Sequence, residues 1–303
     1  MKVIFVGSPQ IAAAYLEILS QDYEIPLVIT QAAKAKGRGL KMASTPVAEM
    51  ARKLNIKLLE VTDINSTQVI EEINNSGAQL GIVVAFGQLI KKTTRESLVN
   101  GFINLHFSLL PELRGADPVT AAISRGLTST GVSVFELGEE LDSGPLYITE
   151  KVQIDPEETT QSLFEKLFPV GKAALMSAVE KIKRGEKPLP QSGQVSYAPK
   201  TSKADYRINW TLPNFQIERL IRSGSNSKFA WTTTNGLSIK FTKARCVDTS
   251  LNCEVGETRI DNQVIVQTGS GALEILEVIP EGKRVMSALE WARGVKVSKV
   301  SFK

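Results

Sequence analysis

Residues 104–111 read Asn104-Leu105-His106-Phe107-Ser108-Leu109-Leu110-Pro111, and His106 is the only histidine of the chain. Its imidazole is the one side chain here whose ordinary pKa, about 6.5, lies near neutrality. Apolar residues before and between these positions predict a strand that ends in the Leu-Pro turn. Asn104 and His106 are two residues apart, so they point to the same face of that strand. An amide and an imidazole just before a loop fit a site at the carboxyl edge of a sheet.

An acidic turn further along the chain bears on the role of this histidine. A lone histidine near a strand end is more often structural than catalytic. The second segment reads Glu139-Glu140-Leu141-Asp142-Ser143-Gly144-Pro145 and lies between two strand-like runs, 131–137 and 146–154. Acidic turns are usually solvated. If this turn reaches the same sheet edge, Asp142 can orient His106 and stabilise its charged form.

Upstream of both motifs, short apolar runs alternate with segments of helical spacing. Strands are predicted at 2–6, 25–30, 57–61 and 79–86, and helices at 11–19, 45–55 and 66–76. This alternation predicts an α/β fold with a doubly wound, mostly parallel sheet. The turn Gly7-Ser8-Pro9 lacks the spacing of a dinucleotide-binding motif, so NAD is not predicted.

Downstream, the composition divides the chain into two domains. Residues 185–204 are rich in Pro, Ser and Gly and are predicted to be a linker. It separates an N-terminal domain, 1–184, from a C-terminal domain, 205–303. Strand-like runs at 230–233, 238–242, 263–267 and 272–278 predict a small β-barrel of about five strands in the second domain.

Composition and charge narrow the class of protein. With 303 residues, 42% of them hydrophobic and 22% charged, the chain has the composition of a soluble globular protein. The apolar start is too short for a signal peptide or a membrane span, so a cytoplasmic protein without membrane association is predicted. Cys246 and Cys253 lack neighbouring ligands, and no metal site is predicted. Residues 205–303 carry 14 Lys and Arg against 10 Asp and Glu, which mildly favours a polyanionic partner.

The order and spacing of three motifs resemble those of the folate-dependent formyltransferase family. They are NLHFSLLP at 104–111, RGADP at 114–118 and ELDSG at 140–144. The resemblance implies a Rossmann-like N-terminal domain, an OB-like C-terminal barrel and 10-formyltetrahydrofolate as co-substrate. It also implies that Asn104, His106 and Asp142 form the catalytic set. The implied folate pocket comprises Phe86, Gly87, Gln88, Leu89, Ser108, Leu109, Leu110, Pro111, Leu141, Ser143 and Gly144, although core packing equally explains the apolar members taken singly.

The stretch 31–44, QAAKAKGRGLKMAS, is a basic loop without an acidic residue. Taken alone, such a loop is usually a solvated surface. Members of the family that act on methionyl-tRNA carry a basic Gly-Arg-Gly loop at this place. The resemblance therefore implies that Lys34, Lys36, Arg38 and Lys41 contact the acceptor end of an initiator methionyl-tRNA.

Formyl transfer to an amine makes clear demands on the three motif residues. The tetrahedral intermediate needs a hydrogen-bond donor for its oxyanion, which Asn104 can supply. A proton must leave the amine, and the folate nitrogen must gain one. His106 can act as the general base and acid for these transfers, and Asp142 can orient it. Neither a metal nor a covalent enzyme intermediate is required.

Two other functions remain open from the sequence. One is a formyltransferase that acts on a nucleotide-linked amino sugar and shares the same three residues. The other is a catalytically inactive RNA- or folate-binding protein. Glycinamide ribonucleotide formyltransferases are disfavoured because they normally lack a C-terminal segment of this size. No sequence feature predicts an obligate protein partner.

Overall fold

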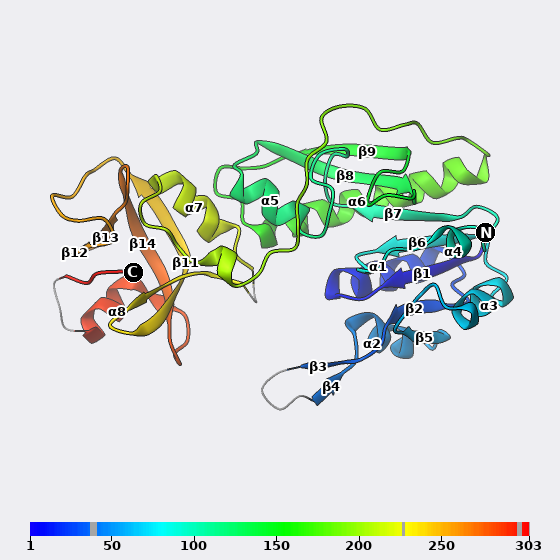
Figure 1. Ribbon diagram of the computed structural model, residues 1–303, viewed down its shortest axis with the longest axis horizontal. Coiled ribbons are helices and arrows are strands. Elements are labelled where there is room, and N and C mark those ends of the chain that lie inside the picture. The colour runs from blue at the N-terminus through cyan, green and yellow to red at the C-terminus, as the bar shows by residue number, and fades with distance from the viewer. Residues whose placement is uncertain (37–40, 226–227, 296–298, 303) are drawn as a thin grey trace. The chain divides into compact units, whose positions relative to one another are not determined.

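The computed structural model describes residues 1–36, 41–225, 228–295 and 299–302, and Figure 1 labels its helices and strands. Arg38, predicted to contact tRNA, lies outside these residues. The chain divides into two compact units. The first comprises residues 1–118, 130–152 and 166–199, and the second comprises residues 119–129, 153–165 and 200–303. Within the described ranges, no helix is both long and apolar enough to cross a membrane.

A seven-stranded sheet forms the centre of the first unit, in the order β5-β2-β1-β6-β7-β8-β9. Its strands are β1 (Val3–Gly7), β2 (Val28–Gln31), β5 (Leu58–Val61), β6 (Leu80–Val84), β7 (Phe102–His106), β8 (Ser129–Glu136) and β9 (Leu146–Gln153). β5, β2, β1, β6 and β7 are parallel, and β8 is antiparallel to β7. The strand order reverses between β1 and β6, which is the switch point where doubly wound sheets bind ligands. The predicted Rossmann-like fold is confirmed, and His106 ends the second strand beyond that switch point.

Helices accompany these strands along the chain. They are α1 (Gln10–Asp22), α2 (Pro46–Lys53), α3 (Thr67–Asn75), α4 (Lys92–Arg95), α5 (Pro118–Ser124) and α6 (Thr160–Lys183). Helices α1 and α3 pack on opposite faces of the sheet. On one face, Val69 and Ile73 of α3 join a buried cluster that contains Ile4 and Val6 of β1. Gly7 alternates with these residues and points to the opposite face, where a Cβ on it would lie 2.7 Å from the Cβ of Ala12 in α1.

The basic stretch 31–44 differs from the loop that the sequence predicts. It contains an antiparallel pair, β3 (Lys34–Lys36) and β4 (Lys41–Ala43), with Lys34 opposite Ala43. These strands have three residues each and no apolar run, so the usual strand pattern is missing. The helix that follows begins as predicted, because the Thr45 hydroxyl accepts a hydrogen bond from the Ala48 amide at 3.1 Å.

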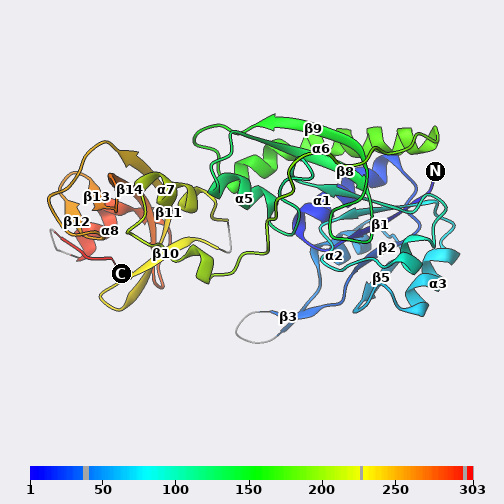
Figure 2. The same cartoon turned by 45° about the horizontal axis from the view of Figure 1, so that its top comes forward.

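An antiparallel sheet forms the centre of the second unit, in the order β10-β11-β14-β13-β12, with β15 paired to β14. Its elements are the 3₁₀ helix η1 (Ala204–Tyr206), α7 (Asn214–Arg222), β10 (Ala230–Thr234), β11 (Leu237–Val247), β12 (Thr258–Ile260), β13 (Val264–Gln267), β14 (Ala272–Pro280), β15 (Met286–Ser287) and α8 (Ala288–Val295). Helix α7 contacts β11 and α8 contacts β14, as can be followed in Figure 2. The aromatic rings of Trp210, Phe241 and Phe302 pack together in the core. The four strand-like runs predicted for the C-terminal domain are present as β10, β11, β13 and β14 of an antiparallel sheet, to which β12 and β15 are added.

Candidate active site

The turn after β7 is fixed by two serine hydroxyl groups, one from the neighbouring strand β8 and one from the turn itself. Ser133 of β8 lies opposite His106 in the sheet. Its hydroxyl donates to the Ser108 carbonyl at 2.7 Å and accepts from the Leu110 amide at 3.0 Å. The Ser108 hydroxyl in turn donates to the Glu112 carbonyl at 2.6 Å. These bonds place the segment that carries Leu113 directly beside the histidine ring.

His106 is buried with only 5% of its surface exposed, and its Nε2 atom lies 2.9 Å from the Leu113 carbonyl oxygen. A carbonyl oxygen can only accept, so Nε2 carries the proton and the neutral ring presents a bare Nδ1. That Nδ1 lies 3.8 Å from Oδ2 of Asp142. Burial lowers the pKa of His106, and the Asp142 charge and the Leu113 hydrogen bond only partly oppose this effect. The resting imidazole is therefore neutral, with its free nitrogen facing a carboxylate.

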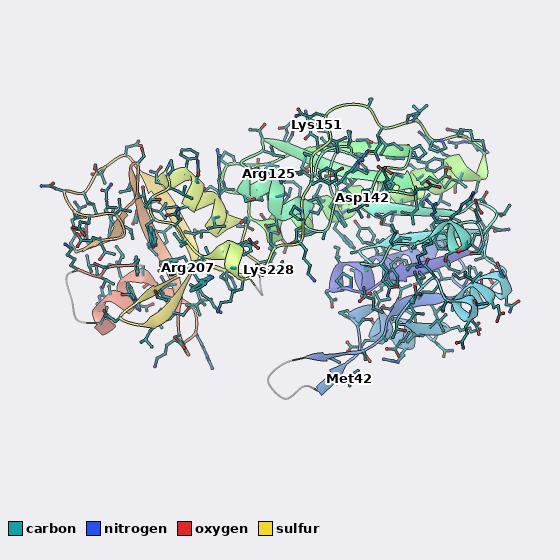
Figure 3. All side chains as sticks on the ribbon, viewed as in Figure 1. Met42, Arg125, Asp142, Lys151, Arg207 and Lys228 are labelled. Atoms are coloured by element: carbon teal, nitrogen blue, oxygen red, sulfur yellow. The ribbon has the colours of Figure 1, made fainter. Side chains whose placement is uncertain are left out.

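Asp142 reaches this position from the loop between β8 and β9, where Figure 3 labels it. Its side chain is 10% exposed, and Oδ2 accepts a hydrogen bond from the Gly115 amide at 2.7 Å. Its φ of 50° lies in the left-handed region. The loop folds back closely on β8, since a Cβ on Gly144 would stand 1.7 Å from the Glu136 carbonyl oxygen. The acidic turn and the end of β7 therefore meet at one site.

Asn104 shares its strand face with His106, because the two residues alternate with Leu105 along β7. It is half-buried, whereas Leu105 is 2% exposed and packs in the core. Within the part of the chain that the structure describes, no group hydrogen-bonds to its carboxamide. This amide is therefore available to a bound molecule.

The residues predicted to line a folate pocket separate into buried and accessible groups. The buried members are Phe86, Ser108, Leu110, Pro111 and Gly144, and the accessible or half-buried members are Gly87, Gln88, Leu89, Leu109, Leu141 and Ser143. Phe86 lies in the apolar cluster under the sheet, while Leu89 and Leu141 are 55% and 56% exposed. Gln88 holds its own turn in place, with hydrogen bonds of 3.0 Å to the Ile64 amide and 3.2 Å to the Thr62 carbonyl. The structure also has a cavity of about 460 Å³, which is lined by residues such as Arg95, Glu136 and Tyr147. None of the predicted pocket residues lines it.

Two main-chain groups that hold the site together were not predicted from the sequence. They are the Leu113 carbonyl, which accepts from His106, and the Gly115 amide, which donates to Asp142. Both belong to the stretch around the RGADP motif, to which the sequence assigned no role beyond the family resemblance. The glycine of this motif was the sequence feature that could have indicated a close main-chain approach. Gly115 has a φ of 120°, and a Cβ there would lie 2.6 Å from the Ala198 carbonyl oxygen.

Comparison with known proteins agrees with this architecture. Residues 1–179 match the formyl transferase family, and residues 200–296 match the formyl transferase C-terminal domain. A methionyl-tRNA formyltransferase of Thermobifida fusca (strain YX) is 33% identical over 301 residues, covering 98% of this chain and 97% of that protein. Another, from Agathobacter rectalis (strain ATCC 33656), is 37% identical over 307 residues, covering 100% of this chain and 99% of that protein.

A solved structure gives the same fold at lower sequence identity. The crystal structure of WlaRD, a sugar 3N-formyl transferase in the presence of dTDP and 5-N-formyl-THF, has a TM-score of 0.67 at 19% identity. The match covers 94% of this chain and 99% of that chain, and it bears on the fold alone. The two family matches and the nearly full-length similarity above settle the relationship. The chain belongs to the methionyl-tRNA formyltransferase family of enzymes.

Proposed function

We propose that this protein transfers the formyl group of 10-formyltetrahydrofolate to the free amino group of initiator methionyl-tRNA. The observation that carries the chemistry is the arrangement of a neutral, buried His106 beside Asp142, on the strand that also presents the Asn104 amide. The acceptor is proposed from similarity over nearly the whole chain to enzymes named for methionyl-tRNA.

Bond formation and cleavage in this reaction balance without another reactant. The amine nitrogen attacks the formyl carbon, a C–N bond forms, and the carbonyl electrons move to oxygen. The Asn104 amide donates a hydrogen bond to that oxygen. The carbonyl re-forms as the bond from the formyl carbon to the folate nitrogen breaks. The amine loses one proton and the folate nitrogen gains one.

Proton transfer uses the free nitrogen of His106. Nε2 is engaged with the Leu113 carbonyl, so the proton from the amine is accepted at Nδ1, directly or through water. The imidazolium that forms lies between a carbonyl oxygen and the Asp142 carboxylate, which both favour a positive charge. The same Nδ1 then returns the proton to the folate nitrogen. Such transfer contributes typically about 10²–10⁴-fold to a rate.

The folate has apolar surface available near this site. Leu89 and Leu141 expose 55% and 56% of their surface, on the two loops that the family resemblance assigns to the folate pocket. Exposed apolar side chains of this kind cover flat ring systems in ligand sites. In this proposal the buried members, such as Ser108 and Leu110, shape the loops without contacting the ligand.

A cluster of cations and aromatic rings in the second unit supports RNA as the partner. Lys203 and Arg207 lie 4.9 and 5.7 Å from the centre of the Trp231 ring. The neighbouring strand places Lys240 opposite Trp231, and Lys240 lies 5.8 Å from the centre of the Phe229 ring. Cations neutralise phosphates, and aromatic rings stack on bases. The contacts assigned from sequence to Lys34, Lys36, Arg38 and Lys41 belong to the same proposal.

A single-turnover formylation assay with 10-formyltetrahydrofolate tests this function. Charged initiator methionyl-tRNA is offered in parallel with free methionine and with a nucleotide-linked amino sugar. We expect rapid formylation of the tRNA alone, abolished by His106→Ala and weakened in apparent affinity by Arg38→Ala. Reaction of the amino sugar alone would leave the chemistry intact and refute the acceptor. Folate binding without any transfer would refute the enzymatic proposal.

A further inference from the structure

Residues 189–198, within the predicted linker, form a strap along the candidate site. At one end, Leu189 and Leu146 of β9 exchange main-chain hydrogen bonds of 2.9 and 2.7 Å. At the other end, the Arg114 amide donates to the Ser196 carbonyl at 2.9 Å, and the Ala198 amide donates to the Arg114 carbonyl at 2.7 Å. The strap is therefore bound both to the strand after the acidic turn and to the turn after β7.

Between these ends, Gln191 uses its whole side-chain amide. Its Nε2 donates to the Asp142 carbonyl and to the Gly144 carbonyl, both at 2.8 Å. Its Oε1 accepts from a terminal nitrogen of Arg114 at 2.6 Å. An amide nitrogen has two protons, so both donor positions of Gln191 are occupied by the acidic turn. One side chain thus joins the Asp142 turn to the residue between Leu113 and Gly115.

The residues on either side of Arg114 are those that hold the catalytic pair. The Leu113 carbonyl accepts from His106, and the Gly115 amide donates to Asp142. Leu113 and Asp142 have φ values of 57° and 50°, in the left-handed region that non-glycine residues rarely adopt. Such backbone conformations persist only where surrounding contacts determine them. Gln191 supplies such contacts to the Asp142 turn.

We propose that Gln191 is a positioning residue for formyl transfer, which fixes the Asp142 turn at its distance from His106 without touching either substrate. This inference rests on the proposed roles of His106 and Asp142. It goes beyond them because it makes a side chain of the predicted linker part of the catalytic machinery. Arg114, 8% exposed, is the anchor on the opposite side of Gln191.

The test compares Gln191→Met with Gln194→Met. Gln194 lies on the same strap and is exposed, so it is a matched control. Loss of positioning by about 1 Å costs on the order of 10²-fold in rate, so we expect kcat of Gln191→Met to fall about 10- to 100-fold. KM for methionyl-tRNA should change less than about twofold, and Gln194→Met should behave as wild type. Gln191→Glu, which keeps the acceptor for Arg114 and loses the donor for the turn, should lose kcat similarly.

A double-mutant cycle separates positioning from a general structural role. Asp142→Asn alone should lower kcat, and adding Gln191→Met to it should lower kcat by less than about twofold more. An equal loss from Gln191→Met in both backgrounds would overturn the inference, as would wild-type kcat in Gln191→Met or Gln191→Glu. Wild-type kcat in Asp142→Asn would refute the proposed role of Asp142 and the inference with it. Activity of Asp142→Asn on its own therefore distinguishes the two failures.

Discussion

The Nδ1 atom of His106 faces the Oδ2 atom of Asp142 at 3.8 Å, while Nε2 of the same ring donates to the Leu113 carbonyl at 2.9 Å. The first distance is longer than a hydrogen bond, so the carboxylate acts on the resting ring through its charge. The second contact fixes the ring plane and the tautomer. The two contacts leave one nitrogen for proton transfer and place a negative charge beside it.

The first prediction concerns the pH dependence of formyl transfer in Asp142→Asn. His106 must be neutral to accept a proton, so the rate is lost as pH falls through its pKa. Burial lowers this pKa and the Asp142 charge raises it, so removing the charge lowers the pKa further. The acid limb of the pH profile should therefore move to lower pH, and the maximal single-turnover rate should be lower than in the wild type. The asparagine side chain of this variant keeps an oxygen that can accept from the Gly115 amide, so the turn is retained. An acid limb displaced to higher pH would contradict the assignment of His106 as the group that accepts the proton.

A second prediction separates catalysis from stability at Asn104. Asn104→Ala should lower kcat by about 10²–10³-fold, or roughly 3–4 kcal/mol, because the oxyanion loses its donor. The free energy of unfolding should change little, since no group in the described part of the chain hydrogen-bonds to this carboxamide. Single-turnover kinetics and urea unfolding measure the two effects.

Ser133→Ala is the control for the stability measurement on Asn104→Ala. The Ser133 hydroxyl is buried and makes hydrogen bonds to Ser108 and Leu110. Its loss leaves buried main-chain groups without a partner, which costs about 1–3 kcal/mol of stability. A stability loss in Asn104→Ala as large as that in Ser133→Ala would show that Asn104 is structural.

The parallel sheet could be predicted from sequence because its inner strands are buried on both faces. Every residue of β1 and of β6 is buried, so each reads as a continuous apolar run between turns. Asn104, His106 and Asp142 could be proposed as site residues from sequence, since they lie in recognisable motifs. Asp142 reaches the end of β7, which is the arrangement that its predicted interaction with His106 requires.

Main-chain contacts of the site could not be predicted in the same way. The Leu113 carbonyl reaches His106 because Leu113 adopts a left-handed backbone conformation. A leucine at this position does not predict that conformation. Similarly, a segment rich in Pro, Gly and Ser predicts a linker and does not reveal that its backbone pairs with Leu146 and Arg114. Such pairing uses main-chain amides and carbonyls, which all residues except proline carry, so the residue type does not show where it occurs.

A third prediction compares Gly115→Ala with Gly185→Ala. Their φ values are 120° and 72°, so an alanine is strained at both positions. A Cβ on Gly115 would lie 2.6 Å from the Ala198 carbonyl oxygen, whereas none of the described atoms lies within 4 Å at Gly185. We expect urea unfolding to show a loss of about 1 kcal/mol for Gly185→Ala and about 1–3 kcal/mol more for Gly115→Ala. Formyl transfer should fall only in Gly115→Ala, because that amide holds Asp142.

A fourth prediction tests the cation and aromatic cluster around Trp231. Arg207 is exposed and lies 5.7 Å from the centre of the Trp231 ring. If its charge neutralises a tRNA phosphate, Arg207→Glu should weaken methionyl-tRNA binding and reduce the slope of log affinity against log salt by about 1. The rate at saturating tRNA should be unchanged, because the substitution leaves His106 and Asp142 in place. Filter binding at several salt concentrations and single-turnover kinetics measure these quantities.

Arg259→Glu is the matched control for Arg207→Glu. It makes the same change of charge on an exposed residue of β12, at the opposite end of the strand order from β10, which carries Trp231. A general electrostatic attraction of tRNA to the basic C-terminal part would weaken binding equally in both variants, since both alter the net charge by the same amount. A local contact at Trp231 requires that Arg207→Glu reduce affinity and salt slope while Arg259→Glu leaves the slope unchanged. Equal slopes in the two variants would therefore remove the cluster from the proposed tRNA surface.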